Sequence, residues 1–296
     1  MKVKLLDFKE LKNFPSGSAI EYYNEKIYLV GDDARELLIL NKRWKEAESL
    51  SLFPREENEP PRIPKKVKPD LEASTVVEIN SIPRLLVLGS GSREKFRSKA
   101  LLVNLDDLYK EEFDVSAFYE RLKPLGMSVI NIESAAIIMD KLILGNRGHK
   151  AAPDNHAIIT SHEFWKDQET AEISTLKFDL PEPTQGNFAG ISGMAYAPEN
   201  DWLLFTMSTE NTDNAEDDGE IGDSYLCIVE NAAWKIGRKK IKVNHQLNLG
   251  QIYKWARGYK IESVCIQSEK VNRVKIHLVA DNDTGVTYLF KAVVKI

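Results

Sequence analysis

The sequence predicts an all-β protein, a β-propeller of five four-stranded blades that forms one domain over residues 1–296. Three observations lead to this prediction. A pattern of short strands recurs five times, the strand-like runs are rich in Val, Ile and Leu, and one strand at the N-terminus is left over to close a ring. A ring of six blades is the alternative.

The repeat is clearest from Asn131 to Arg147, where the sequence reads NIESAAIIMDKLILGNR. Each copy begins with an acidic or hydroxyl residue next to a small one, which we call the anchor residue. An apolar strand, a polar turn and a second apolar strand follow. Successive anchors are 54, 61, 59 and 70 residues apart, as is typical of propeller blades. The anchor residues are Ser18, Glu72, Glu133, Ser192 and Glu262.

The first three strands of each blade follow the anchor in order. First strands are expected at 19–23, 74–79, 135–139, 194–197 and 263–267. The second strands read IYLVG, LLVLG, LILG, LLFTM and IHLVA, which are too short for helices and apolar enough to be buried on both faces. Third strands are expected to start at Glu36, Ala100, His156, Tyr225 and Thr287.

The outer strands are more polar, as expected of an edge exposed to water. We expect them at 46–53, 171–180 and 240–249, and we expect 2–11 to complete the last blade. Residues 53–70 contain five prolines and predict a loop between blades one and two. In blade two, a short helix with Phe118, Leu122 and Leu125 on one face, capped by Asp114 or Ser116, takes the place of the outer strand.

Composition excludes several classes of partner. Lys and Arg number 40 and Asp and Glu 45, so the net charge is −5, and the mixed charges favour neither nucleic acid nor an anionic membrane as partner. The N-terminal residues lack the features of a signal peptide. Cys227 and Cys265 lie in apolar runs and are expected to be buried thiols. We therefore expect a cytoplasmic protein with a small-molecule ligand, and leave a protein partner open.

The strand order also predicts where a site would lie. The first strand of each blade is innermost in a propeller, so the anchors should converge around one mouth of the central channel. The loop after each second strand should lie at the same face, because the two strands are antiparallel. These loops carry polar residues, among them Asp32, Asp33, Arg93, Arg97, Asn146 and Arg147.

Three converging glutamates need a cation, shared protons or arginine partners. Calcium prefers carboxylate and amide oxygens, so the sequence predicts Glu72, Glu133 and Asn146 as metal ligands. Arg147 and Arg93 instead suit an anionic ligand. The ligand-binding residues expected at this mouth are these two arginines, the three glutamates, Ser18 and Ser192. The alternative is that the glutamates have a structural role, in which they accept hydrogen bonds from backbone N–H groups of the neighbouring blade.

The repeat starts NIES, DLEAS and KIES, and the loops LGSGSREKFRSK and LGNRGHKAAPDN, resemble an uncharacterised bacterial β-propeller family, a domain of unknown function. That family is similar to phytase-esterase-like propellers and, more distantly, to gluconolactonase-type propellers. The last resemblance implies a divalent cation held by a Glu, an Asn and an Asp. Glu72 or Glu133 matches the Glu and Asn146 or Asn155 the Asn; no residue matches the Asp, and those propellers usually have six blades.

Three functions follow from these observations. The first is a hydrolase of a small ester, lactone or phosphoester, with a cation that polarises the substrate. The second is a glycosidase that uses two central carboxyl groups. The third is a binding or scaffold propeller without catalysis, since the fold alone does not imply a reaction. The sequence leaves open whether the protein is an enzyme.

Overall fold

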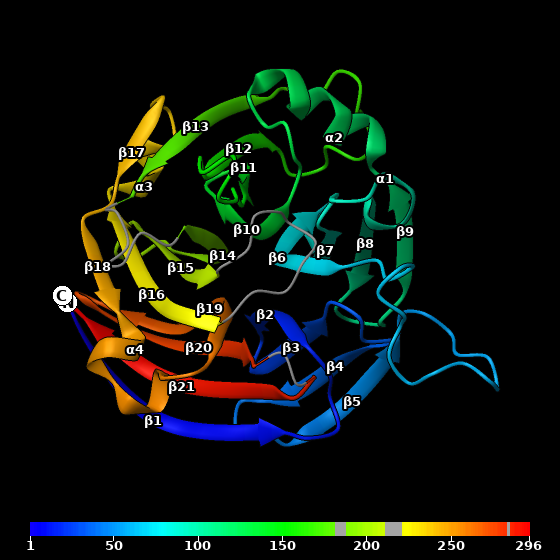
Figure 1. Cartoon of the computed structure of the whole chain (residues 1–296), viewed down its shortest axis with the longest axis horizontal. Coiled ribbons are helices and arrows are strands. Elements are labelled where there is room, and N and C mark those ends of the chain that lie inside the picture. The colour runs from blue at the N-terminus through cyan, green and yellow to red at the C-terminus, as the bar shows by residue number, and fades with distance from the viewer. Residues whose placement is uncertain (181–187, 211–220, 283–284) are drawn as a thin grey trace.

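The computed structural model describes residues 1–180, 188–210, 221–282 and 285–296. Five small sheets surround a common centre, and each sheet is one blade (Figure 1). This arrangement confirms the predicted five-bladed β-propeller. Among the described residues, no helix is long and apolar enough to span a bilayer.

Blades one to four run from the centre outward in sequence order. Blade one contains β2 (Gly17–Tyr23), β3 (Lys26–Gly31), β4 (Glu36–Asn41) and β5 (Glu46–Ser51). Blade two contains β6 (Leu71–Ile79), β7 (Ile82–Gly89), β8 (Lys99–Asn104) and β9 (Lys110–Asp114). Blade three contains β10 (Ile132–Ile138), β11 (Lys141–Asn146), β12 (His156–Ser161) and β13 (Ser174–Asp179).

Blade four contains β14 (Ala189–Ala197), β15 (Trp202–Glu210), β16 (Ile221–Glu230) and β18 (His245–Asn248). Blade five contains β19 (Lys260–Lys270), β20 (Arg273–Asp281), β21 (Thr287–Lys295) and β1 (Lys2–Leu11). The short helices are α1 (Glu94–Arg97), α2 (Ser116–Leu122), α3 (Ala232–Lys235) and α4 (Leu249–Ile252), with 3₁₀ turns at Lys123–Leu125 and Lys254–Ala256.

The N-terminal strand closes the ring as predicted. β1 pairs antiparallel with β21 from Lys2 opposite Lys295 to Leu11 opposite Thr287. Figure 1 shows the first strand, in blue, along the outer side of the last strand, in red. The two ends of the chain therefore build one blade, which fixes them together without a separate closing element.

The apolar core lies between the blades. One cluster of buried side chains fills each of the five interfaces, including the interface between the last blade and the first. A blade faces a neighbour on each side, so its second strand is buried on both faces, as Leu85 to Leu88 show. Cys227 and Cys265 are free and buried within this core, as expected.

Two predictions about outer strands were wrong. Blade two has a regular outer strand, β9, and helix α2 follows it instead of replacing it. The run KEEFD of β9 is too short and polar to indicate a strand from its sequence. Phe118 and Leu122 of α2 are buried, whereas Leu125 is exposed. Val115 occupies the N-cap position without a side-chain bond, and Asp114 Oδ1 accepts from the Ser116 N–H.

The segment predicted as one strand at 240–249 is divided between two blades. β17 (Lys240–Lys242) pairs parallel with β13 and becomes a fifth strand of blade three. β18 pairs antiparallel with β16 in blade four. Lys240 Nζ also contacts Asp179 Oδ1 at 3.0 Å, which adds an exposed ion pair to this edge.

Candidate functional site: the anchor residues and an ionic cluster

Every anchor residue occupies a β-bulge. In all five blades the pairing register between the first and second strands shifts by one residue at the anchor. A bulged residue has no partner in the ladder, and the bend of the strand redirects its side chain. The repeat seen in the sequence is therefore a repeated backbone feature, with side chains that differ from blade to blade.

The two serine anchors join their blade to the next one. Ser18 Oγ donates a hydrogen bond to the carbonyl oxygen of Leu71, and Ser192 Oγ donates to that of Ile261 at 2.7 Å. Each of these carbonyls belongs to the residue just before the next anchor. Both serines are buried. In blades one and four the anchor thus holds neighbouring blades together through a side-chain to backbone bond.

Replacing Ser192 by alanine is expected to lower the free energy of unfolding by about 1–3 kcal/mol, because the buried Ile261 carbonyl loses its side-chain donor. Urea unfolding followed by tryptophan fluorescence measures this change. Ser49→Ala, at an exposed position of β5, is the matched control. Equal stability of the two variants would show that this bond between blades contributes nothing measurable.

The glutamate anchors of blades two and three lie close together. Burial raises the pKa of Glu72 well above its ordinary value, and the nearby carboxylates of Glu133, Asp70 and Asp32 raise it further. No described residue donates a hydrogen bond to the Glu72 carboxyl. Glu133 Oε1 accepts from Asn131 Nδ2 at 2.7 Å. The third glutamate anchor, Glu262, forms an ion pair of 3.1 Å with Lys260, on its own strand.

An ionic cluster surrounds Glu72 on the side of blade one. Its acidic members are Asp32, in the loop after β3, Asp70, two residues before the anchor, and Glu72 itself. One ligand atom of each lies within 4.8 Å of the others. Lys68 Nζ contacts Asp32 Oδ2 and lies 2.7 Å from Asp70 Oδ1. Arg97 Nη1 donates to Asp70 Oδ2, also at 2.7 Å.

These contacts set the charges of the cluster. Burial tends to raise the pKa of Asp70, but Lys68 and Arg97 bring it below its ordinary value. Burial raises the pKa of Asp32 to about 6, although Lys68 opposes this. Lys68 and Arg97 bring two positive charges to this acidic cluster. Burial and the neighbouring carboxylates favour the uncharged form of Glu72, because they raise its pKa.

The three acids could hold a metal ion, since hard cations bind carboxylate oxygens. However, the ammonium group of Lys68 contacts two of the three and supplies the positive charge that a metal ion would supply. The donor set does not fit a divalent cation while Lys68 is in place. Of the predicted ligands Glu72, Glu133 and Asn146, only Glu72 belongs to this acidic group.

The amide of Asn146 bonds to the backbone at both ends. Oδ1 accepts from the Asn131 N–H at 2.7 Å, and Nδ2 donates to the Val129 carbonyl at 3.4 Å. Asn155 connects blades three and four, because its Oδ1 accepts from the Ile191 N–H at 3.0 Å and its Nδ2 donates to Ala189. These bonds leave little freedom for either amide to turn toward a ligand.

Arg147 is buried between blades three and four. Its Nη1 donates to Ser208 Oγ at 3.1 Å and lies 4.0 Å from Glu133 Oε2. A Cβ on Gly190 would lie 2.3 Å from Arg147 Nε, so the guanidinium fits only because glycine stands there. Arg147 therefore places a buried positive charge near Glu133. Arg93 is the N-cap residue of α1, and the neighbouring Arg97 supplies the contact to Asp70.

A model of a family of unknown function, DUF6929, matches residues 13–294. The chain belongs to this family. No curated protein matches the sequence.

The DUF6929 chain is similar in structure to the glutaminyl cyclase of Myxococcus xanthus, with a TM-score of 0.53 and 7% identity over 99% of this chain and 97% of that one. It is also similar to a GH130 protein, from the family of mannoside phosphorylases that contains glycoside hydrolases for β-1,2-mannosidic linkages in Candida mannan. That match has a TM-score of 0.51 and 12% identity over 94% and 84% of the two chains. Identities this low show a shared fold and nothing about the reaction.

The sequence did not point to two residues of the ionic cluster, Lys68 and Asp70. Both precede the anchor Glu72, and Lys68 lies in the proline-rich loop, which the sequence predicts only as a connection between blades. Asp70 has a φ of 55°, an uncommon left-handed conformation for a residue other than glycine. Its position two residues before an anchor was the only signal available in the sequence.

Proposed function

We propose that the protein is a hydrolase that binds a small polar substrate beside Glu72 and Glu133, with Glu72 as the proton donor. The observation that carries this proposal is the state of the Glu72 carboxyl. Its pKa is raised well above the ordinary value by burial and by Glu133, and no described residue donates a hydrogen bond to it. A carboxyl group with such a perturbed pKa at a polar mouth is a candidate for general acid catalysis.

The neighbours of Glu72 fit complementary roles. Glu133 accepts a hydrogen bond from Asn131 and lies near Arg147, and in this proposal it would accept a proton from a water molecule. Glu72 would give its proton to the leaving oxygen of the substrate. Small esters, lactones and phosphoesters have such a leaving oxygen. No metal ion is required for these two steps, since Lys68 and Arg97 already supply positive charge nearby.

A glycosidase is the second candidate, and the same pair of groups favours it. Glycoside hydrolysis needs one protonated and one ionised carboxyl group on either side of the bond. Glu72 and Glu133 provide two carboxyl groups, and Glu133 raises the pKa of Glu72. A binding protein without catalysis remains the alternative that the experiment must distinguish.

Glu72→Gln tests the role of the proton donor. We expect the variant to lose roughly a hundredfold in kcat against its best chromogenic ester, lactone, phosphoester or glycoside, because glutamine cannot give up a proton. Glu133→Gln should also be slow, and Glu48→Gln, at an exposed position of β5, is the control. If the wild type cleaves no substrate of the panel, or if Glu72→Gln is as active as the wild type, the hydrolase proposal fails.

A further inference from the structure

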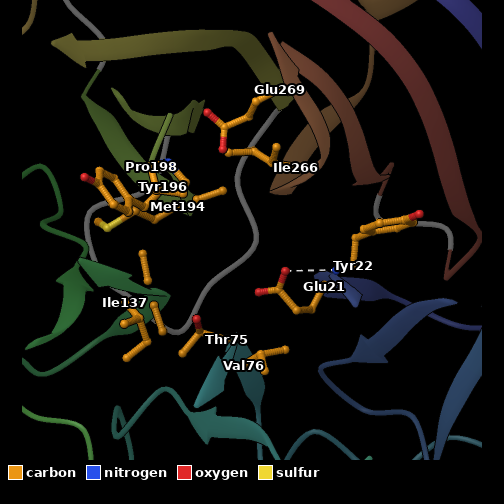
Figure 2. A pocket seen from close by; sticks show the side chains of 13 residues that line it. Glu21, Tyr22, Thr75, Val76, Ile137, Met194, Tyr196, Pro198, Ile266 and Glu269 are labelled. Carbon is orange, nitrogen blue, oxygen red and sulfur yellow. Dashed lines mark hydrogen bonds between the residues drawn. The ribbon is translucent and has the colours of Figure 1, made fainter. Parts of the chain in front are cut away.

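The central channel contains a cavity of about 280 Å³. All five inner strands contribute to its wall, among them Glu21 of β2, Thr75 of β6, Ile137 of β10, Tyr196 of β14 and Glu269 of β19 (Figure 2). These residues lie three or more positions after the anchors, toward the turns that join first and second strands. The cavity, which we call the channel cavity, is therefore displaced along the strands from Glu72 and Glu133.

The charge of the channel cavity has one sign. Glu21 and Glu269 contribute carboxyl groups, and no Lys, Arg or His is among the described residues that line it. Figure 2 shows both glutamate side chains directed into the space between the inner strands. Most of the other residues that line it have apolar side chains, including Ile137, Met194 and Ile266, although polar atoms make up the larger share of the exposed lining. An anion would find no positive partner here, whereas a cation would find two carboxyl groups.

The two glutamates differ in how they are held. Glu269 Oε2 accepts hydrogen bonds from the backbone N–H of Glu199 and from Asn200 Nδ2, both at 3.1 Å, so it is fixed to the neighbouring turn. Within the described part of the chain, Glu21 Oε1 accepts a single hydrogen bond, from the N–H of the next residue, Tyr22, at 2.9 Å. Burial raises the pKa of Glu21 to about 7. Glu21 is thus a half-buried carboxyl group, and no cationic partner for it is found among the described residues.

We propose that the channel cavity binds a small amphipathic organic cation, a primary amine with an apolar body. The ammonium group would lie beside Glu21 and Glu269, and the body would contact Ile137 and Met194. A pocket with an apolar wall and a few placed polar groups is the usual form of a small-molecule site. This site is separate from the proposed hydrolase centre, and neither depends on the other.

Isothermal titration calorimetry with three probes of similar shape tests the proposal. Phenethylammonium should bind saturably at one site, and 2-phenylethanol and 3-phenylpropanoate should bind at least about tenfold more weakly, a difference of about 1.4 kcal/mol. Glu21→Gln should reduce the affinity for phenethylammonium by a similar factor. Glu48→Gln serves as a control on a distant exposed glutamate, and Glu72→Gln should leave the affinity unchanged.

Three results would overturn the proposal: equal affinity for the three probes, unchanged affinity in Glu21→Gln, or no saturable binding of any probe. The comparison of probes in the wild type decides the charge preference even if Glu21→Gln does not fold. Because Glu72→Gln separates the two sites, failure of amine binding leaves the hydrolase proposal intact, and failure of hydrolysis leaves this one intact.

Discussion

Replacing Lys68 by methionine is expected to lower the free energy of unfolding by about 3–5 kcal/mol, because the change removes one partner of a buried ion pair and leaves carboxylates behind. Lys68 and Asp70 expose only 11% and 7% of their side chains. Asp70 would keep its bond to Arg97, whereas Asp32 would lose the ammonium that contacts it. Urea unfolding at pH 7 measures the loss.

Calcium should restore much of this stability in Lys68→Met and little in the wild type. Without the ammonium, Asp32, Asp70 and Glu72 present oxygens within 4.8 Å of one another, and calcium binds oxygens at about 2.3–2.6 Å. A bound ion stabilises the folded state by linkage, and EDTA should reverse the effect. Lys66→Met, at an exposed position of the same loop, is the control.

Two outcomes would contradict this account of Lys68. If Lys68→Met is as stable as Lys66→Met, the ammonium does not hold the cluster together. If calcium stabilises the wild type as much as the variant, a metal ion can bind while Lys68 is present. The second result would support the calcium site that the sequence predicted. Metal analysis of the purified protein by mass spectrometry would then identify the ion.

Glu21 is expected to make the stability of the protein depend on pH. Burial raises its pKa from 4.5 to about 7 in the folded state. The folded state therefore binds the proton more tightly than the unfolded chain does. Glu21 makes its full contribution to the free energy of unfolding below about pH 4.5, and this contribution is lost as the pH rises to about 7. Over this interval the loss amounts to at most about 3 kcal/mol, reduced by whatever screening the solvent provides.

The difference between the wild type and Glu21→Gln isolates this contribution. Urea unfolding at intervals from about pH 4.5 to 8 should show the wild type losing stability relative to the variant as the pH rises. Asp32 and Glu72 have raised pKa values too, and Asp70 has a lowered one, but all three are present in both proteins. The groups nearest Glu21 include Tyr22, Glu269 and Cys265, and burial keeps the Cys265 thiol neutral. A constant difference between the two proteins would show that Glu21 titrates normally.

The repeat in the sequence was sufficient to predict the blades. A blade must bury its second strand on both faces, so runs such as LLVLG are apolar whatever their neighbours are. The count of strands identified the N-terminal strand as the outer strand of blade five, because the last repeat has no fourth strand of its own. Outer strands follow no such rule, because one edge faces water. For this reason β9 was missed, and the segment at 240–249 was assigned to one blade instead of two.

The candidate site was predicted in part. The sequence determined the anchor positions and placed Glu72 and Glu133 near each other, because identical positions in neighbouring blades lie at the same level of the ring. It did not show that each anchor is a β-bulge, since a bulge depends on how two strands pair. The prediction of calcium at Glu72, Glu133 and Asn146 stays a prediction, as do the phytase-like and gluconolactonase-like resemblances.

The sequence by itself determined the fold, the order of the blades and the residues that begin each inner strand. Only the tertiary structure decided the charges around Glu72 and the polarity of the channel cavity. Lys68, in the loop between blades one and two, reaches Asp32 in the loop after β3. Glu21 and Glu269 line the same cavity although 248 residues separate them in the chain. The physical reason is that periodic burial is a local property of the chain, whereas the pKa of a carboxyl group depends on every charge and solvent boundary that folding brings near it.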